Sequence, residues 1–124
     1  MLNRQLEFQA GQGRLCVRAV VHETGGHGLC CVVTGGELAH IGGAAACYQS
    51  ESAALTTEEL SFPTHKDAVL AKQLAEKLRL ATGQDVVAVV GIHVDHASSK
   101  DIQTLCDNAL SAIETYLDVK EATY

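Results

Sequence analysis

The expected fold follows from the run Val86-Val87-Ala88-Val89-Val90-Gly91-Ile92. This run is rich in β-branched residues, it is shorter than a typical helix, and it is apolar at both alternating sets of positions. A strand that is apolar on both faces is typical of the interior of a sheet, where neither face meets water. We therefore predict that these residues form the central strand of the protein.

Helical patterns flank this strand on both sides. The first, over residues 64–83, has leucines at four-residue spacing and a glycine where the helix should end. It opens with Thr64 three residues before Asp67, which is the spacing of a capping box. The second pattern starts at Ser98 and keeps one long apolar face as far as Leu117. The second half of the chain is thus predicted as helix, strand and helix.

The first half of the chain is patterned as strands. Residues 15–22 alternate with a period of two, and residues 29–33 return as a second strand after a glycine-rich turn. A third strand is expected within residues 38–48 and a short fourth one at residues 60–62. This order predicts an α/β two-layer sandwich: a mainly antiparallel meander followed by helix-strand-helix, with both helices on one face of the sheet.

Length and composition narrow the class of protein. The 124 residues, of which 47% are hydrophobic and 19% charged, predict one globular domain over residues 1–124. The net charge is -6 and basic residues form no run, which disfavours nucleic acid as a partner. Apolar stretches are too short to span a membrane, and the first residues do not resemble a signal peptide, so we expect a cytoplasmic location. The five cysteines include no C-x-x-C pair, which predicts reduced thiols.

The starts of the two helices carry the candidate binding residues. His65 and Lys66 precede the first helix, whose N–H groups and dipole favour an anion such as phosphate. His93, Asp95 and His96 follow the central strand at its carboxyl end, where open α/β sheets usually bind ligands. His93 and Asp95 share one face because side chains alternate along a strand.

Three interpretations of these histidines remain open. His93, Asp95 and His96, joined by His40 or His65, have the side chains of a transition-metal site in a small metal-dependent enzyme. The same imidazoles are also typical of structural residues whose ring nitrogens are bound by backbone and carboxylate groups. The third interpretation is a site for an organic ligand. No G-x-S-x-G, G-x-G-x-x-G or P-loop motif is present, which disfavours hydrolase, dinucleotide and nucleoside-triphosphate sites.

A glycine-rich segment, residues 34–43, joins two of the predicted strands. Gly35, Gly36 and Gly42 have no side chain and would allow a flat ligand to lie against the backbone, with His40 beside it. An ordinary turn with a bulge explains the same glycines.

Three segments together resemble the LpdD-like prenylated-flavin chaperone family: residues 34–42, 63–66 and 91–98. The resemblance extends over residues 14–117. Thr64 and His96 stand where the family pattern has glycine and asparagine. Members accompany UbiD-type decarboxylases such as gallate decarboxylase.

The resemblance implies a homodimer with a fold similar to that of proteasome assembly chaperones. It also implies that the protein binds prenylated FMN or FMN and helps deliver it to a decarboxylase, with a flavin prenyltransferase as a further partner. The residues expected to bind the flavin are Gly35, Gly36, His40, Gly42, His65, Lys66, His93, Asp95 and His96. This is an accessory role rather than catalysis, and a chaperone of protein assembly is a further alternative. A sheet covered by helices on one side also predicts a dimer, because its other face or an edge needs cover.

Overall fold

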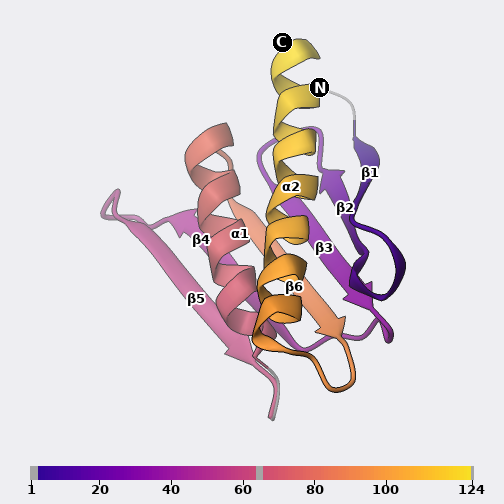
Figure 1. The fold of residues 1–124 in the computed structure, drawn as a ribbon. Coiled ribbons are helices and arrows are strands. Elements are labelled where there is room, and N and C mark those ends of the chain that lie inside the picture. Colours follow the sequence, from indigo (N-terminus) through magenta and orange to yellow (C-terminus); the bar gives the residue numbers. More distant parts are fainter. Residues whose placement is uncertain (1–2, 64–65, 124) are drawn as a thin grey trace.

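The computed structural model describes residues 3–63 and 66–123, which form a single sheet with two helices packed on it (Figure 1). The elements in chain order are β1 (Arg4–Ala10), a 3-10 turn η1 (Gly13–Leu15), β2 (Val17–Glu23), β3 (Leu29–Gly36), β4 (Gly43–Gln49), β5 (Leu55–Ser61), α1 (Asp67–Thr82), β6 (Val86–His93) and α2 (Ser99–Thr123). The predicted α/β class is confirmed.

The strand order across the sheet is β1-β2-β3-β6-β4-β5. The segment 86–92 lies within β6, between β3 and β4, so the predicted central position of this strand is confirmed. The expectation that neither face of the strand meets water is wrong, because the helices cover one face only and Val87, on the other face, is 43% exposed. Strand β6 runs parallel to β3 and antiparallel to β4, and the remaining pairs are antiparallel, which makes the sheet mainly antiparallel. The expected meander is interrupted, because β6 inserts between β3 and β4, which are consecutive in the chain.

Three strand predictions need correction. Strand β1 was not predicted, although its apolar residues alternate. It lies at an edge of the sheet, where its side chains are only half-buried. The fourth strand extends over Leu55–Ser61 instead of 60–62 and is mostly exposed at the opposite edge, where apolar alternation is not required. Residues 38–42 of the expected third strand lie outside it, because β4 begins only at Gly43.

Both helices cover the same face of the sheet, as predicted (Figure 1). Helix α1 packs mainly on β4 and β6, and α2 mainly on β1 and β2. Every second residue of the inner strands is buried beneath them. The core consists of Val17, Ala19, Val21, Leu29, Cys31, Val33, Ala45, Cys47, Leu70, Ala71, Leu74, Ala75, Leu78, Val86, Ala88, Val90, Val94, Leu105, Ala109, Ala112, Ile113 and Tyr116. Among the residues that the structure describes, neither helix is long and apolar enough to cross a membrane.

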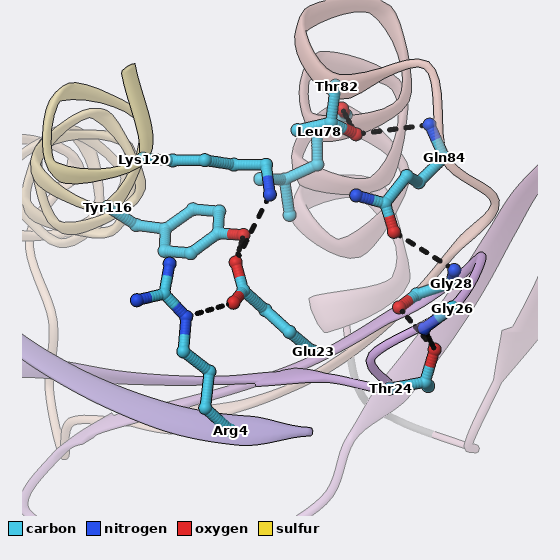
Figure 2. Close-up of polar contacts among 10 residues, drawn as sticks. All are labelled: Arg4, Glu23, Thr24, Gly26, Gly28, Leu78, Thr82, Gln84, Tyr116 and Lys120. Atoms are coloured by element: carbon cyan, nitrogen blue, oxygen red, sulfur yellow. Dashed lines mark hydrogen bonds and ion pairs between the residues drawn. The ribbon is translucent and has the colours of Figure 1, made fainter. Parts of the chain in front are cut away.

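A buried carboxylate joins the edge of the sheet to the carboxyl-terminal half of α2 (Figure 2). Glu23, at the end of β2, accepts hydrogen bonds from Arg4 of β1, from the Tyr116 hydroxyl at 2.5 Å and from the Lys120 ammonium at 3.2 Å. Although burial opposes ionisation, these three donors lower the pKa of Glu23 from 4.5 to about 2. The cluster lies at the opposite end of α2 from the candidate site (Figure 1).

Candidate functional site

A cavity of about 400 Å³ opens where the amino ends of α1 and α2 meet the carboxyl end of β6. This is the lower end of the molecule in Figure 1. The lining residues are His40, Lys66, Asp67, Leu70, Ile92, His93, Val94, Ala97, Ile102, Leu105 and Cys106. Its volume falls within the range of small-molecule sites. It also lies at the carboxyl end of the central strand, as predicted.

One wall of the cavity is polar and is built around Asp67, the first residue of α1. Its Oδ1 accepts a hydrogen bond from the Ile92 backbone N–H at 3.2 Å. Its Oδ2 lies 3.4 Å from Nε2 of His40, and both side chains are mostly buried. The other ring nitrogen of His40, Nδ1, lies 3.3 Å from the Leu38 carbonyl oxygen. The orientations of the carboxylate and the imidazole are therefore set by contacts from three segments.

A second histidine and carboxylate lie beside this pair. Nε2 of His93 is 2.8 Å from Oδ1 of Asp95. The rings of His93 and His40 meet edge to face, with centroids 6.1 Å apart. Asp95 is mostly exposed and does not line the cavity, although its backbone N–H donates to the Glu37 carboxylate at 2.9 Å. Among the described residues, the site thus contains two histidine–carboxylate pairs, of which the His40 pair is mostly buried and the His93 pair more exposed.

The rest of the lining is largely apolar and comes mainly from α2. Leu105, Ile102, Val94 and Ala97 belong to this apolar wall, together with the thiol of Cys106. Partial burial, reinforced by the charges of two nearby aspartates, raises the pKa of the Cys106 thiol. This wall therefore presents a neutral surface suited to the apolar body of a ligand.

The loop of residues 37–42 carries His40 into the cavity because it is bound tightly at both ends. The Glu37 N–H donates to the His93 carbonyl at 2.7 Å, and the Gly42 N–H donates to the Val90 carbonyl at 2.9 Å. Between these bonds the His40 carbonyl lies directly against Gly91, where a β-carbon would come within 1.4 Å of it. The absence of a side chain at Gly91 thus allows the loop to cross β6.

The glycines predicted to face a flavin lie outside the cavity lining. A β-carbon at Gly35 would be 2.6 Å from the Cys16 carbonyl oxygen, and one at Gly36 would be 2.3 Å from that of His93. Gly36 also has a φ of 78°, which favours glycine. Gly42 is buried and bonded to the neighbouring strand. Close packing of backbone segments accounts for Gly35 and Gly36.

The remaining predicted residues are distributed unevenly around the cavity. His40, Lys66 and His93 line it, and Asp95 contacts it through His93. His96 is exposed outside the lining and has a φ of 53°, a left-handed conformation in which His is tolerated better than most residues. His65 lies outside the described residues, and so does Thr64, the residue expected to cap α1.

The starts of the two helices differ in their capping. At α2 the predicted capping box is confirmed: the Asp101 N–H donates to the Ser98 hydroxyl at 3.0 Å, and the Ser98 N–H donates to the Asp101 carboxylate at 3.1 Å. At α1 the N-cap residue is Lys66, which makes no side-chain cap bond. The start of α2 is therefore capped by side chains, whereas the N-cap residue of α1 supplies no side-chain cap.

Sequence reasoning missed Asp67 and the apolar wall. Asp67 was treated only as part of a capping box, and the apolar residues of α2 were assigned to the core. The sequence feature that could have indicated Asp67 as a site residue is its position directly after the predicted anion-binding pair, His65 and Lys66. Within the described residues, no group of three or more His, Cys, Asp or Glu side chains is arranged to hold a metal ion.

Comparison with known proteins identifies the family. The family model described as a prenylated flavin chaperone LpdD-like domain matches residues 11–120. The chain belongs to this LpdD-like family. The match begins after β1, so it covers β2 to β6 and nearly all of α2. No curated protein matches the chain significantly in sequence.

A solved structure with the same architecture belongs to a chaperone complex for yeast 20S proteasome assembly. It is 11% identical in sequence, covers 98% of each chain and superposes with a TM-score of 0.67. At this identity the likeness concerns the fold alone. The predicted similarity of this LpdD-like protein to proteasome assembly chaperones is thereby confirmed.

The lining of the cavity in this LpdD-like chain suits the chemistry of a flavin. A flavin combines a flat, largely apolar ring with polar ring edges and a phosphate, and the cavity combines an apolar wall with Asp67, His40, His93 and Lys66. Within the described residues, the lining contains no Phe, Tyr or Trp. Aliphatic side chains rather than aromatic stacking would therefore contact the ring.

Proposed function

We propose that this protein binds prenylated FMN in the cavity between α1, α2 and β6 and carries it to a UbiD-type aromatic acid decarboxylase, gallate decarboxylase being one example. The observation that supports this most is the cavity itself, which lies inside the segment matched by the prenylated flavin chaperone family. The role is that of an accessory protein, and a flavin prenyltransferase is the proposed source of the cofactor.

The proposed binding mode uses both walls of the cavity. Ile102 and Leu105 would contact the apolar ring system, and the polar wall would bind its edges. Lys66, exposed at the start of α1, would pair with the phosphate together with His65, whose sequence position adjoins it. An ammonium–phosphate contact at a helix start is a favourable charge-assisted interaction. Reversible binding is favoured by the absence of aromatic stacking from the described lining.

The direct test is coexpression with a flavin prenyltransferase. The purified protein is examined for the absorbance spectrum of a bound flavin and for metal content. A flavin in stoichiometric amount, lost in an Ile102→Asp variant that remains folded, supports the proposal, because Ile102 lines the cavity and is exposed. A stoichiometric metal without flavin would instead support a metal-dependent enzyme, and neither would point to a chaperone of protein assembly.

The phosphate contact is tested separately with His65→Ala and Lys66→Ala. Each change should weaken FMN more than riboflavin, because only FMN carries the phosphate, with a loss of about 1–3 kcal/mol per contact. Lys72→Ala, on the outer side of α1 in an ion pair with Glu59, is a matched control. Equal losses for FMN and riboflavin would show that the phosphate binds elsewhere.

We also propose that the chain is a homodimer formed through the uncovered face of the sheet. The strand registers align Val20, Val32, Val89, Ala44 and Leu60 in one apolar row across five strands on that face. Two of these side chains are exposed, Leu60 at 60% and Val32 at 37%, and the other three are partly buried. A continuous exposed apolar surface of this kind is typical of an interface.

Sedimentation at micromolar concentration tests the dimer. Val32→Lys should yield a monomer, whereas Val69→Lys, on the exposed side of α1, should leave the dimer intact. A monomeric wild-type protein would refute the proposal. A cytoplasmic location is also proposed, since all five cysteines are free thiols.

A further inference from the structure

The polar part of the cavity contains a hydrogen-bond acceptor, the Asp67 side chain, with hydrogen-bond donors near it. The Asp67 carboxylate is oriented by the Ile92 N–H and faces the cavity with only 12% of its side chain exposed. N–H donors for a ligand come from two other segments: Lys66 at the start of α1 and His93 at the end of β6. This arrangement complements a ligand edge in which one hydrogen-bond donor lies beside hydrogen-bond acceptors.

The pyrimidine part of a flavin ring has that pattern. Its N3–H group donates and lies between two carbonyl groups that accept. The phosphate has only acceptors and carries negative charge, so it would be repelled by the buried Asp67 carboxylate. The chemistry of the wall therefore favours the pyrimidine edge of the ring beside Asp67, with the phosphate toward exposed Lys66 at the opening.

We infer that Asp67 accepts the N3–H of the bound flavin, while His93 donates to an adjacent ring carbonyl. This inference rests on the proposed function and adds which edge of the ligand the site recognises. It assigns binding specificity to a residue that the sequence presented only as a helix cap. It also defines the ligand class as a flat heterocycle with an imide edge.

The first experiment measures the ionisation of the bound flavin at N3. Absorbance is followed as the pH is raised, using the prenylated flavin that copurifies with the chain, or FMN. A carboxylate beside N3 opposes loss of the N3 proton, so the flavin should ionise at higher pH in the wild type than in Asp67→Asn. Asp107→Asn is the matched control, because Asp107 is exposed on α2 and lies outside the cavity lining.

The second experiment is a binding cycle with FMN and N3-methyl-FMN. Methylation removes the donor, so it should weaken binding to the wild type by about tenfold or more and binding to Asp67→Asn much less. The control Asp107→Asn should retain the wild-type preference. Should Asp67→Asn fail to fold, which its melting curve would reveal, the preference of the wild type for FMN over N3-methyl-FMN still tests the inference.

The possible results separate the two proposals. Suppose that the wild type binds a flavin. The assignment of Asp67 is overturned if Asp67→Asn does not change N3 ionisation, or if the wild type tolerates methylation at N3. Either result leaves the carrier function in place. Failure of the wild type to bind either flavin overturns the proposed function and this inference with it.

Discussion

Replacing the buried Glu23 by Gln should destabilise the protein by about 2–4 kcal/mol at pH 7, because a buried ionic cluster loses the carboxylate that three donors share. The substitution keeps the size of the side chain but gives it an N–H₂ group among the donors of Arg4, Tyr116 and Lys120. Arg4 is partly exposed and can turn toward water, whereas Lys120 is largely buried and would lose an ionic partner.

The pH dependence gives an independent estimate of the same interaction. A pKa lowered from 4.5 to about 2 corresponds to about 3 kcal/mol in favour of the charged form. Because the folded protein holds this carboxylate ionised, the stabilisation is present above the pKa of the unfolded chain. It is lost as the pH falls from about 5 to about 2. The difference in stability between wild type and Glu23→Gln should therefore shrink over this interval.

Thermal unfolding followed by circular dichroism at pH 7, 5, 4 and 3 measures both effects at one fixed protein concentration. A loss of this size lowers the melting temperature by on the order of 10 °C at pH 7. Glu7→Gln is the control, since Glu7 pairs with Arg18 at 2.6 and 2.8 Å on the exposed surface and should matter little. Equal effects of the two substitutions, or a Glu23→Gln difference independent of pH, would refute the reasoning.

Four other substitutions test the site and its supports. Gly91→Ala should cost about 2 kcal/mol or more in urea unfolding, because its methyl group would overlap the His40 carbonyl; unchanged stability would contradict this close approach. His96→Gly should raise the stability by about 1 kcal/mol, since φ is 53° there, and a loss would show that the imidazole makes a stabilising contact. Asp95→Asn should leave the melting curve nearly unchanged while lowering flavin retention, because Asp95 is exposed and orients His93; lost stability with unchanged affinity would assign a structural role. Ser98→Ala should cost about 1 kcal/mol by removing the cap of α2, and a much smaller effect in thermal unfolding would mean that water replaces the hydroxyl.

The features that sequence predicted well depend on interactions between near neighbours. The helix over residues 64–83 was recognised from its leucine spacing, and α1 ends as expected, with Gly83 in a left-handed conformation at φ 71°. The capping box at Ser98 was recognised from a three-residue spacing. Such patterns are visible in sequence because their partners lie within one helical turn.

The candidate site was predicted in part. His93 and Lys66 were found because they flank recognisable elements, and both line the cavity. The apolar wall was missed because Leu105 and Cys106 show the periodicity of any buried helix face. The glycines at 35 and 36 were interpreted as ligand contacts, yet the structure packs them against backbone. A glycine in a sequence indicates a close approach without revealing what approaches.

The sequence by itself determined that residues 86–92 form an interior strand of the sheet, since every side chain there is apolar or absent. It did not determine that one face of this strand stays uncovered by the helices, with Val87 43% exposed. It also could not determine which strands would pair with this strand. Only the tertiary structure placed β6 between β3 and β4 and thereby brought His40, from the loop joining those two strands, to Asp67 and His93. The physical reason is that strand pairing and cavity formation depend on contacts between segments distant in the chain. Those contacts are selected by the packing of the whole molecule, and local sequence patterns do not contain them.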